Sequence, residues 1–215
     1  MNIKLNVPNK LSEIALSDYV KYLKILEINE KDENSDVFVQ QKVLEVFCGV
    51  PYNESLEFKM SDVSKIVNII NNTLSEQPSL VKSFKLGDTE FGFIPKLDDM
   101  SFGEYIDIDT NIGDWDNMYR VMSVLYRPIK QKSGEKYLID EYKGDLYYDA
   151  MRHTPMDAVI SSLVFFYNLG KELSMAMIDF LETETEGDSM QLQTSMSDTV
   201  GITQFKHLLS SMSLK

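Results

Sequence analysis

The chain has 215 residues, of which 43% are hydrophobic, which is enough for one domain with a substantial core. Acidic residues outnumber basic residues by 34 to 21, giving a net charge of −13 that disfavours binding to a nucleic-acid backbone. No apolar run approaches the roughly 20 residues of a membrane helix, and no signal-peptide core follows Met1. A soluble protein without nucleic-acid or membrane partners is therefore expected.

The first third of the chain is expected to be helical after one short strand. Residues 2–7 alternate polar and apolar side chains, as a half-buried strand does. Helices are predicted after an N-cap at Ser17, over residues 36–47, and after an N-cap at Ser61. The charged stretch 27–34 lacks periodicity and predicts a loop.

Turn chemistry predicts two β-hairpins further along, because Gly supplies the positive φ that two-residue turns need. Between the hairpins, Ser101 and Glu104 have the spacing of a capping box that opens a short helix. A further helix is expected from Trp115 to Tyr126. It should end there because Arg127, the residue before Pro128, is disfavoured in the α region. The strand pairs are residues 80–86 with 89–94 around Gly87-Asp88, and residues 129–132 with 136–139 around Ser133-Gly134.

Arg127 interrupts an otherwise apolar and aromatic stretch. This pattern predicts that its guanidinium is buried against a carboxylate, since a buried charge needs a partner. Replacing Arg127 with Ala is expected to cost stability or solubility.

The most apolar segment begins at Thr154-Pro155, a helix cap followed by proline at the first helical position. A central helix of about 25 residues is expected from Met156 to about Leu181, since nearly every face of its first half is apolar. The composition then becomes polar, which predicts a linker over residues 183–197. Helical spacing of apolar side chains returns in residues 198–215.

The expected fold class is α+β, predominantly helical, with two hairpins and a long central helix. A single domain is predicted over residues 1–182, with a helical part (1–79) and a part that contains the hairpins and the central helix (80–182), followed by the linker and a C-terminal docking helix (198–215).

The C-terminal helix is too short to be stable alone in water, so it must dock on its own domain or on a partner. The acidic stretch that begins at Asp98 favours a solvated or partner-facing edge, where charge steers docking. The residues predicted to bind a partner are Ile202, Phe205, Leu208, Leu209, Met212, Asp98 and Asp99.

No combination of residues predicts catalysis, a metal site or a cofactor. Asp107, Asp109 and Asn111 begin like a calcium loop, but Ile112 and Met118 stand where that loop needs Gly and Glu. A turn rich in Asp and Asn is expected instead. A metal-dependent enzyme that uses Asp107 and Asp109 remains a rival hypothesis.

The remaining reactive side chains are isolated in the sequence. His153 and His207 have no second His or Cys at helical spacing. Cys48, the single cysteine, lies at the apolar end of an expected helix and is predicted to be a buried small side chain.

The central part of the chain resembles a set of tailed-bacteriophage proteins found among virion and assembly genes, including those of crAss-like phages and related marine phages. The resemblance covers about residues 80–175 and consists of structural residues. The matching residues are Phe91 to Asp98, Gly103 to Asp107, Trp115, Val124 to Ile129, Tyr137, Glu141-Tyr142, Phe165-Phe166 and Leu169-Gly170.

This resemblance implies a morphogenetic role at the head–tail junction or in the tail, with other phage structural proteins as partners and many copies in a ring or tube. The protein would then be found in the virion, and in the host cytoplasm during assembly. A soluble tail assembly chaperone, absent from the mature particle, is the first alternative, and a host-directed inhibitor is a further one.

Overall fold

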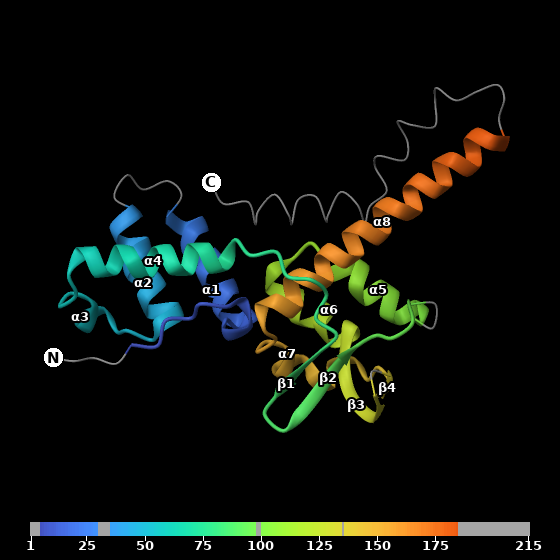
Figure 1. The fold of residues 1–215 in the computed structure, drawn as a ribbon, viewed down its shortest axis with the longest axis horizontal. Helices are drawn as coiled ribbons and strands as arrows, with labels where there is room; N and C mark the ends of the chain where they lie inside the picture. The colour runs from blue at the N-terminus through green and yellow to red at the C-terminus, as the bar shows by residue number, and fades with distance from the viewer. Residues whose placement is uncertain (1–4, 30–34, 98–99, 135, 185–215) are drawn as a thin grey trace.

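The computed structural model describes residues 5–29, 35–97, 100–134 and 136–184, and it confirms an α+β fold (Figure 1). Helices α1 to α4 come first, and a four-stranded antiparallel sheet with helices α5 to α8 follows. In these ranges, no helix combines the length and the low polarity that crossing a bilayer requires.

Three helices of the N-terminal part share one hydrophobic cluster: α1 (Leu16–Asn29), α2 (Ser35–Cys48) and α4 (Met60–Leu74). The short helix α3 (Tyr52–Ser55) connects α2 with α4. The apolar stripe of α4 buries Val63, Ile66 and Ile70, as its i, i+3 and i+7 spacing predicts. Helix α1 also contributes Leu16 and Tyr19 to the second, larger cluster, so it joins the two parts of the fold.

Several local predictions in this part are wrong. Residues 5–7 form no strand, because none of the four described strands pairs with them, and residues 2–4 lie outside the described ranges. Ser17 and Ser61 stand inside the first turns of α1 and α4 rather than at their N-caps. Residues 27–29, predicted as part of a charged loop, belong to α1, which continues to Asn29. The Asn29 side chain donates to the Ile25 carbonyl (2.6 Å). The charged side chains of this stretch therefore do not end the helix at Glu27.

Both predicted hairpins are present, and they join into one sheet with the order β1-β2-β3-β4. The strands are β1 (Ser83–Leu86), β2 (Thr89–Phe93), β3 (Tyr126–Ser133) and β4 (Lys136–Ile139). The helix predicted over 115–126 is a 3-10 turn (Trp115–Asn117) followed by α6 (Met118–Leu125). Tyr126 belongs to β3 instead, because its backbone pairs with that of Phe93.

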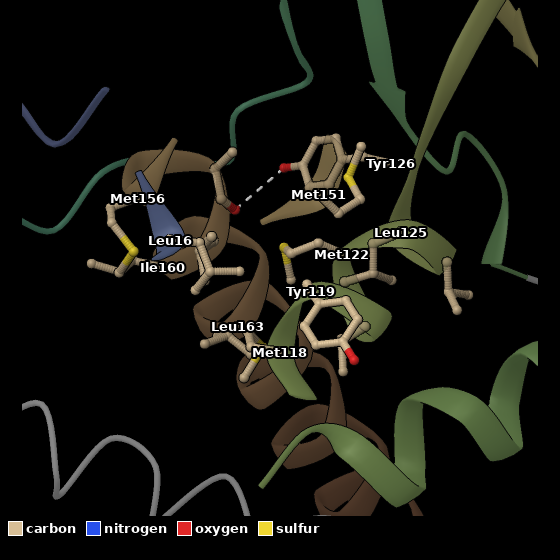
Figure 2. Packing of buried hydrophobic residues seen from close by; sticks show 14 of the residues in the cluster. Leu16, Met118, Tyr119, Met122, Leu125, Tyr126, Met151, Met156, Ile160 and Leu163 are labelled. Carbon is tan, nitrogen blue, oxygen red and sulfur yellow. Dashed lines mark hydrogen bonds between the residues drawn. The ribbon is translucent and has the colours of Figure 1, made fainter. Parts of the chain in front are cut away.

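The main core lies between the sheet, α6 and the first half of α8 (Met156–Glu184). Figure 2 shows side chains from these elements meeting around Met122 and Leu163, which are fully buried. Tyr126 is also fully buried, and its hydroxyl satisfies itself by donating to the Val81 carbonyl (2.7 Å). Four of the methionines fill this core: Met118, Met122, Met151 and Met156.

Helix α8 confirms the predicted central helix and extends to Glu184. Its first turns are buried against α1, α6 and the sheet, whereas its second half projects away from the rest of the described fold (Figure 1). Its 29 residues correspond to a length of about 43 Å. Two short elements, a 3-10 turn (Gly144–Tyr147) and α7 (Tyr148–Met151), connect the sheet to it.

Candidate partner-binding surfaces

Helix α5 (Phe102–Asn111) begins with the capping box that the sequence predicts. The Ser101 hydroxyl oxygen accepts from the Glu104 backbone N–H (3.3 Å), and Glu104 Oε2 accepts from the Ser101 backbone N–H (2.6 Å). Two N–H groups that a helix start leaves without partners are thereby satisfied.

The same Glu104 carboxylate also ties α5 to the sheet. Its Oε1 lies 2.9 Å from Arg127 Nη1 of β3, and the two residues are only 5% and 8% exposed. This confirms the prediction that Arg127 is buried against a carboxylate. The contact is an ion pair without hydrogen-bond alignment, and Arg127 Nε has no hydrogen-bond partner among the described residues.

Helix α5 is amphipathic in an inverted sense. The residues it buries are Glu104, Ile108 and Asn111, of which two are polar. On its outer side, Phe102, Tyr105 and Ile106 are 79%, 56% and 45% exposed. We call these three residues the α5 face; their i, i+3, i+4 spacing places them together on the helix surface.

The surroundings of the α5 face are acidic. Residues 101–117 contain five acidic residues and no Lys or Arg. Glu104 is buried against Arg127 and Asp116 pairs with Lys24 (2.7 Å), which leaves Asp107, Asp109 and Asp114 without an ion pair among the described residues. Asp107 is held in place, because its Oδ2 accepts from the Tyr142 hydroxyl (2.6 Å). The pKa of Tyr142 is raised, mainly by burial and secondly by this hydrogen bond. Its hydroxyl is therefore protonated and acts as a donor at physiological pH.

The predicted Asp- and Asn-rich turn at residues 107–111 is wrong, because these residues form the second half of α5. On a helix, residues i and i+2 are separated by a rotation of about 200°. The side chains of Asp107, Asp109 and Asn111 therefore do not converge as they would in a calcium loop. Among the described residues, no group of three or more His, Cys, Asp or Glu side chains is placed to hold a metal ion.

A groove lies beside the sheet, with a volume of about 1060 Å³. Its walls are the turn that follows β2, strand β4 and Phe165 of α8. Apolar side chains make up most of its lining, and Leu138 within it is 62% exposed. The lining residues are Leu80, Lys82, Phe93, Ile94, Pro95, Lys96, Leu97, Arg127, Lys136, Tyr137, Leu138, Ile139, Asp140, Glu141 and Phe165.

The groove has a basic character that the whole chain lacks, with three Lys and one Arg in its lining against one Asp and one Glu. The negative charge of Asp140 is already balanced by two lysines. Hydrogen bonds from Lys130 (2.7 Å) and Lys143 (3.1 Å) lower the pKa of its carboxyl. Lys82 and Lys136 form no ion pair with any residue that the structure describes. The groove therefore combines an apolar lining with basic side chains, which suits an apolar occupant flanked by acidic residues.

Tyr137 of β4 lines the groove and packs against the neighbouring strand. Its ring lies over Gly92 of β2, where a Cβ would come within 2.6 Å of Tyr137 Cε2. Its hydroxyl shares its one proton between the carbonyls of Lys82 (3.0 Å) and Phe93 (2.8 Å), which fixes β4 across the sheet. Gly92 is thus required for the close approach of the ring.

The sequence-predicted partner-binding residues, Ile202, Phe205, Leu208, Leu209, Met212, Asp98 and Asp99, lie outside the described residues, as does His207. His153 is exposed and forms no part of either surface. Cys48 is half-buried rather than fully buried, and burial raises the pKa of its thiol to about 11.

The two surfaces described above were missed by sequence reasoning. The i, i+3, i+4 spacing of Phe102, Tyr105 and Ile106 was a usable signal, but the same spacing also marks a buried stripe.

Comparison with known proteins adds no identification. No protein-family model, no curated protein and no solved structure matches this chain.

Proposed function

We propose that this protein is a non-catalytic structural or assembly component of a tailed-bacteriophage particle, which acts through protein–protein contacts at the head–tail junction or in the tail. The resemblance of residues 80–175 to phage virion and assembly proteins supports the setting. The α5 face is the observation that carries the mode of action.

A helix that buries polar side chains and exposes aromatic ones is costly in a protein that works alone. Exposed apolar groups that lie together on a helix mark an interaction site, whereas scattered ones do not. Phe102 and Tyr105 are also the large side chains that provide most of the contact area at interfaces. The inverted arrangement of α5 therefore favours a partner that covers this face.

The acidic surroundings define the chemistry of that partner. With Asp107, Asp109 and Asp114 free of ion pairs in the described structure and no basic residue in residues 101–117, the complementary surface is apolar at its centre and basic at its rim. Such charges steer docking and register, and the apolar centre supplies most of the affinity.

Variants in the α5 face test this function in the phage itself. Phe102→Ser with Tyr105→Ser should lower the yield of complete particles at least 10-fold, because truncating an interface anchor typically costs about 2 kcal/mol, or roughly 30-fold in affinity. The melting temperature of the purified variant should stay unchanged, since both side chains are exposed. Leu56→Ser, at a position 67% exposed in the N-terminal part, is the matched control.

Mass spectrometry of purified particles separates the structural role from that of a tail assembly chaperone. A structural component is present in mature particles, whereas a chaperone is found only with unassembled tail proteins in the lysate. Normal particle yield with the α5 variant, together with particles that lack the chain, would refute the proposal.

The rival hypothesis of a metal-dependent enzyme has its own test. Calorimetric titration with calcium, magnesium and zinc should give no binding heat that depends on Asp107 and Asp109.

A further inference from the structure

We infer that the groove beside β4 is the docking site of the chain's own C-terminal segment, residues 198–215, in the free protein. The inference deepens the proposed function, on which it rests, because it assigns an occupant to a second protein-binding surface. Three observations support it: the apolar lining, the distribution of charge, and the length of chain that follows α8.

The apolar lining matches the side chains of the segment. The groove volume of about 1060 Å³ is slightly larger than the roughly 300–1,000 Å³ of typical small-molecule pockets, which leaves room for several side chains. In the sequence, Ile202, Phe205 and Leu209 recur at helical spacing, as in amphipathic helices that bind in grooves. The apolar repeat runs only from Ile202 to Met212, and it needs such a surface because an isolated helix shorter than about 12–15 residues is only marginally stable in water.

Charge complementarity applies to the chain that leads into the apolar part of the segment. Residues 185–205 contain three acidic residues, Glu186, Asp188 and Asp198, and no Lys or Arg, whereas Lys206 and Lys215 follow them. The groove concentrates Lys82, Lys96 and Lys136 in a chain whose net charge is −13. The proposed docking brings this acidic stretch toward the lysines of the groove.

The length of chain allows docking within one molecule. From Phe165, which lines the groove, to the end of α8 at Glu184 the helix rises by about 28 Å. A random-coil chain of 17 residues, the length of residues 185–201, has a root-mean-square span of about 21–25 Å and a maximum of about 60 Å. A linker whose mean span is close to the required distance gives an effective concentration near the millimolar range, which favours the groove of the same molecule.

Crosslinking of the full-length protein with an amine-reactive reagent tests the inference without any substitution. Lys206 and Lys215 lie in the C-terminal segment, and the groove offers three lysines of its own. A mixture of ¹⁴N- and ¹⁵N-labelled protein at low micromolar concentration separates links within one molecule from links between molecules. Links from Lys206 or Lys215 to the groove lysines should be abundant and carry a single isotope.

Internal standards are available in the same chain. Lys130 and Lys143 both bind Asp140, so their crosslink reports normal reactivity and an intact fold. Lys21 and Lys65, exposed on the N-terminal helices, should link to the C-terminal segment at least 10-fold less often than the groove lysines do.

A pair of leucines provides the matched variants. Leu138→Asp changes a groove residue that is 62% exposed, and Leu146→Asp changes a residue outside the groove lining that is 59% exposed. Relative to the Lys130–Lys143 link, the groove links should fall at least 10-fold in the first variant and remain in the second.

Absence of the groove links in the unaltered protein would overturn the inference, as would links that are mainly of mixed isotope. Equal loss in both leucine variants would do the same. Each of these outcomes is independent of the particle assay with the α5 variants, so the inference can fail while the proposed function stands.

Discussion

Replacing Arg127 with Met removes one partner of the buried ion pair while keeping most of the apolar stem. In the native fold Glu104 Oε1 lies 2.9 Å from the guanidinium, and both residues are more than nine-tenths buried. The variant leaves Glu104 buried, with the Ser101 N–H still bound to its other oxygen.

The expected magnitude follows from opposing electrostatic contributions. Two charges about 4 Å apart attract by about 4 kcal/mol at an effective dielectric constant of 20, which roughly offsets the several kcal/mol that burying each ion costs. Removing Arg127 alone abolishes the attraction, while the Glu104 carboxylate stays buried and is not hydrated. The free energy of unfolding should fall by about 3–5 kcal/mol, and the melting temperature by about 6–20 °C for a chain of this size.

The assay is thermal and urea unfolding followed by circular dichroism, with two comparison variants. Adding Glu104→Gln to Arg127→Met should recover more than half of the lost stability, because no unpaired charge remains and the amide oxygen can still accept from Ser101. Lys21→Met removes an exposed pair with the same 2.9 Å separation, Lys21–Asp18, and should cost no more than about 1 kcal/mol. A melting temperature for Arg127→Met equal to that of Lys21→Met would refute the reasoning.

Three further predictions concern single sites. Gly92→Ala should lower the free energy of unfolding by about 1–3 kcal/mol, because the new Cβ displaces the Tyr137 ring. The control is Gly103→Ala, at a helical position with open space around it. In the same thermal and urea unfolding experiments, this variant should be neutral or more stable by up to about 1 kcal/mol. The pKa of Asp140 is lowered in the folded state, so its carboxylate stabilises the fold above the unfolded-state pKa of about 3.9, and this stabilisation is lost as the pH falls below that value. Between pH 6 and pH 2 the native protein should therefore lose more stability than Asp140→Asn. Parallel curves of stability against pH for the two proteins would contradict this. With its pKa raised to about 11, Cys48 should react with iodoacetamide at pH 8 roughly 100-fold more slowly than after unfolding in urea, and equal rates would show that the thiol is not shielded.

Elements governed by local chemistry were predictable from the sequence. The capping box at Ser101 needs only two side chains three residues apart, and the hairpin turns at Gly87 and Gly134 need only a positive φ, which both glycines have. The start of α8 after Thr154-Pro155 follows from an equally local signal.

Elements that depend on a distant partner were not predictable in this way. Tyr126 continues the apolar pattern of α6, yet its backbone pairs with that of Phe93, 33 residues earlier, and this pairing ends the helix. The alternation in residues 5–7 is typical of a strand, but a strand also needs a neighbour, and the described sheet begins at Ser83.

The α5 face shows the same limit at the candidate site. A pattern of Phe102, Tyr105 and Ile106 identifies an apolar side of a helix but does not say whether that side is buried. The orientation of α5 is determined by Glu104, which reaches Arg127 of β3, 23 residues later in the chain. The burial of Arg127 was predictable from its apolar context, whereas the identity of its carboxylate was not.

Self-docking of the C-terminal segment and assembly into a ring or tube are compatible because the effective concentration sets which of them prevails. Under the proposed docking, at micromolar protein concentration the molecule's own segment, at an effective concentration near the millimolar range, would occupy the groove and keep its apolar lining covered. Under the proposed assembly, copies aligned in a particle would present neighbouring segments at a comparable concentration, so exchange between molecules would then cost little. Because the groove and the segment are different surfaces, such an exchange would be heterologous, and heterologous contacts generate closed rings or open tubes rather than isolated twofold dimers.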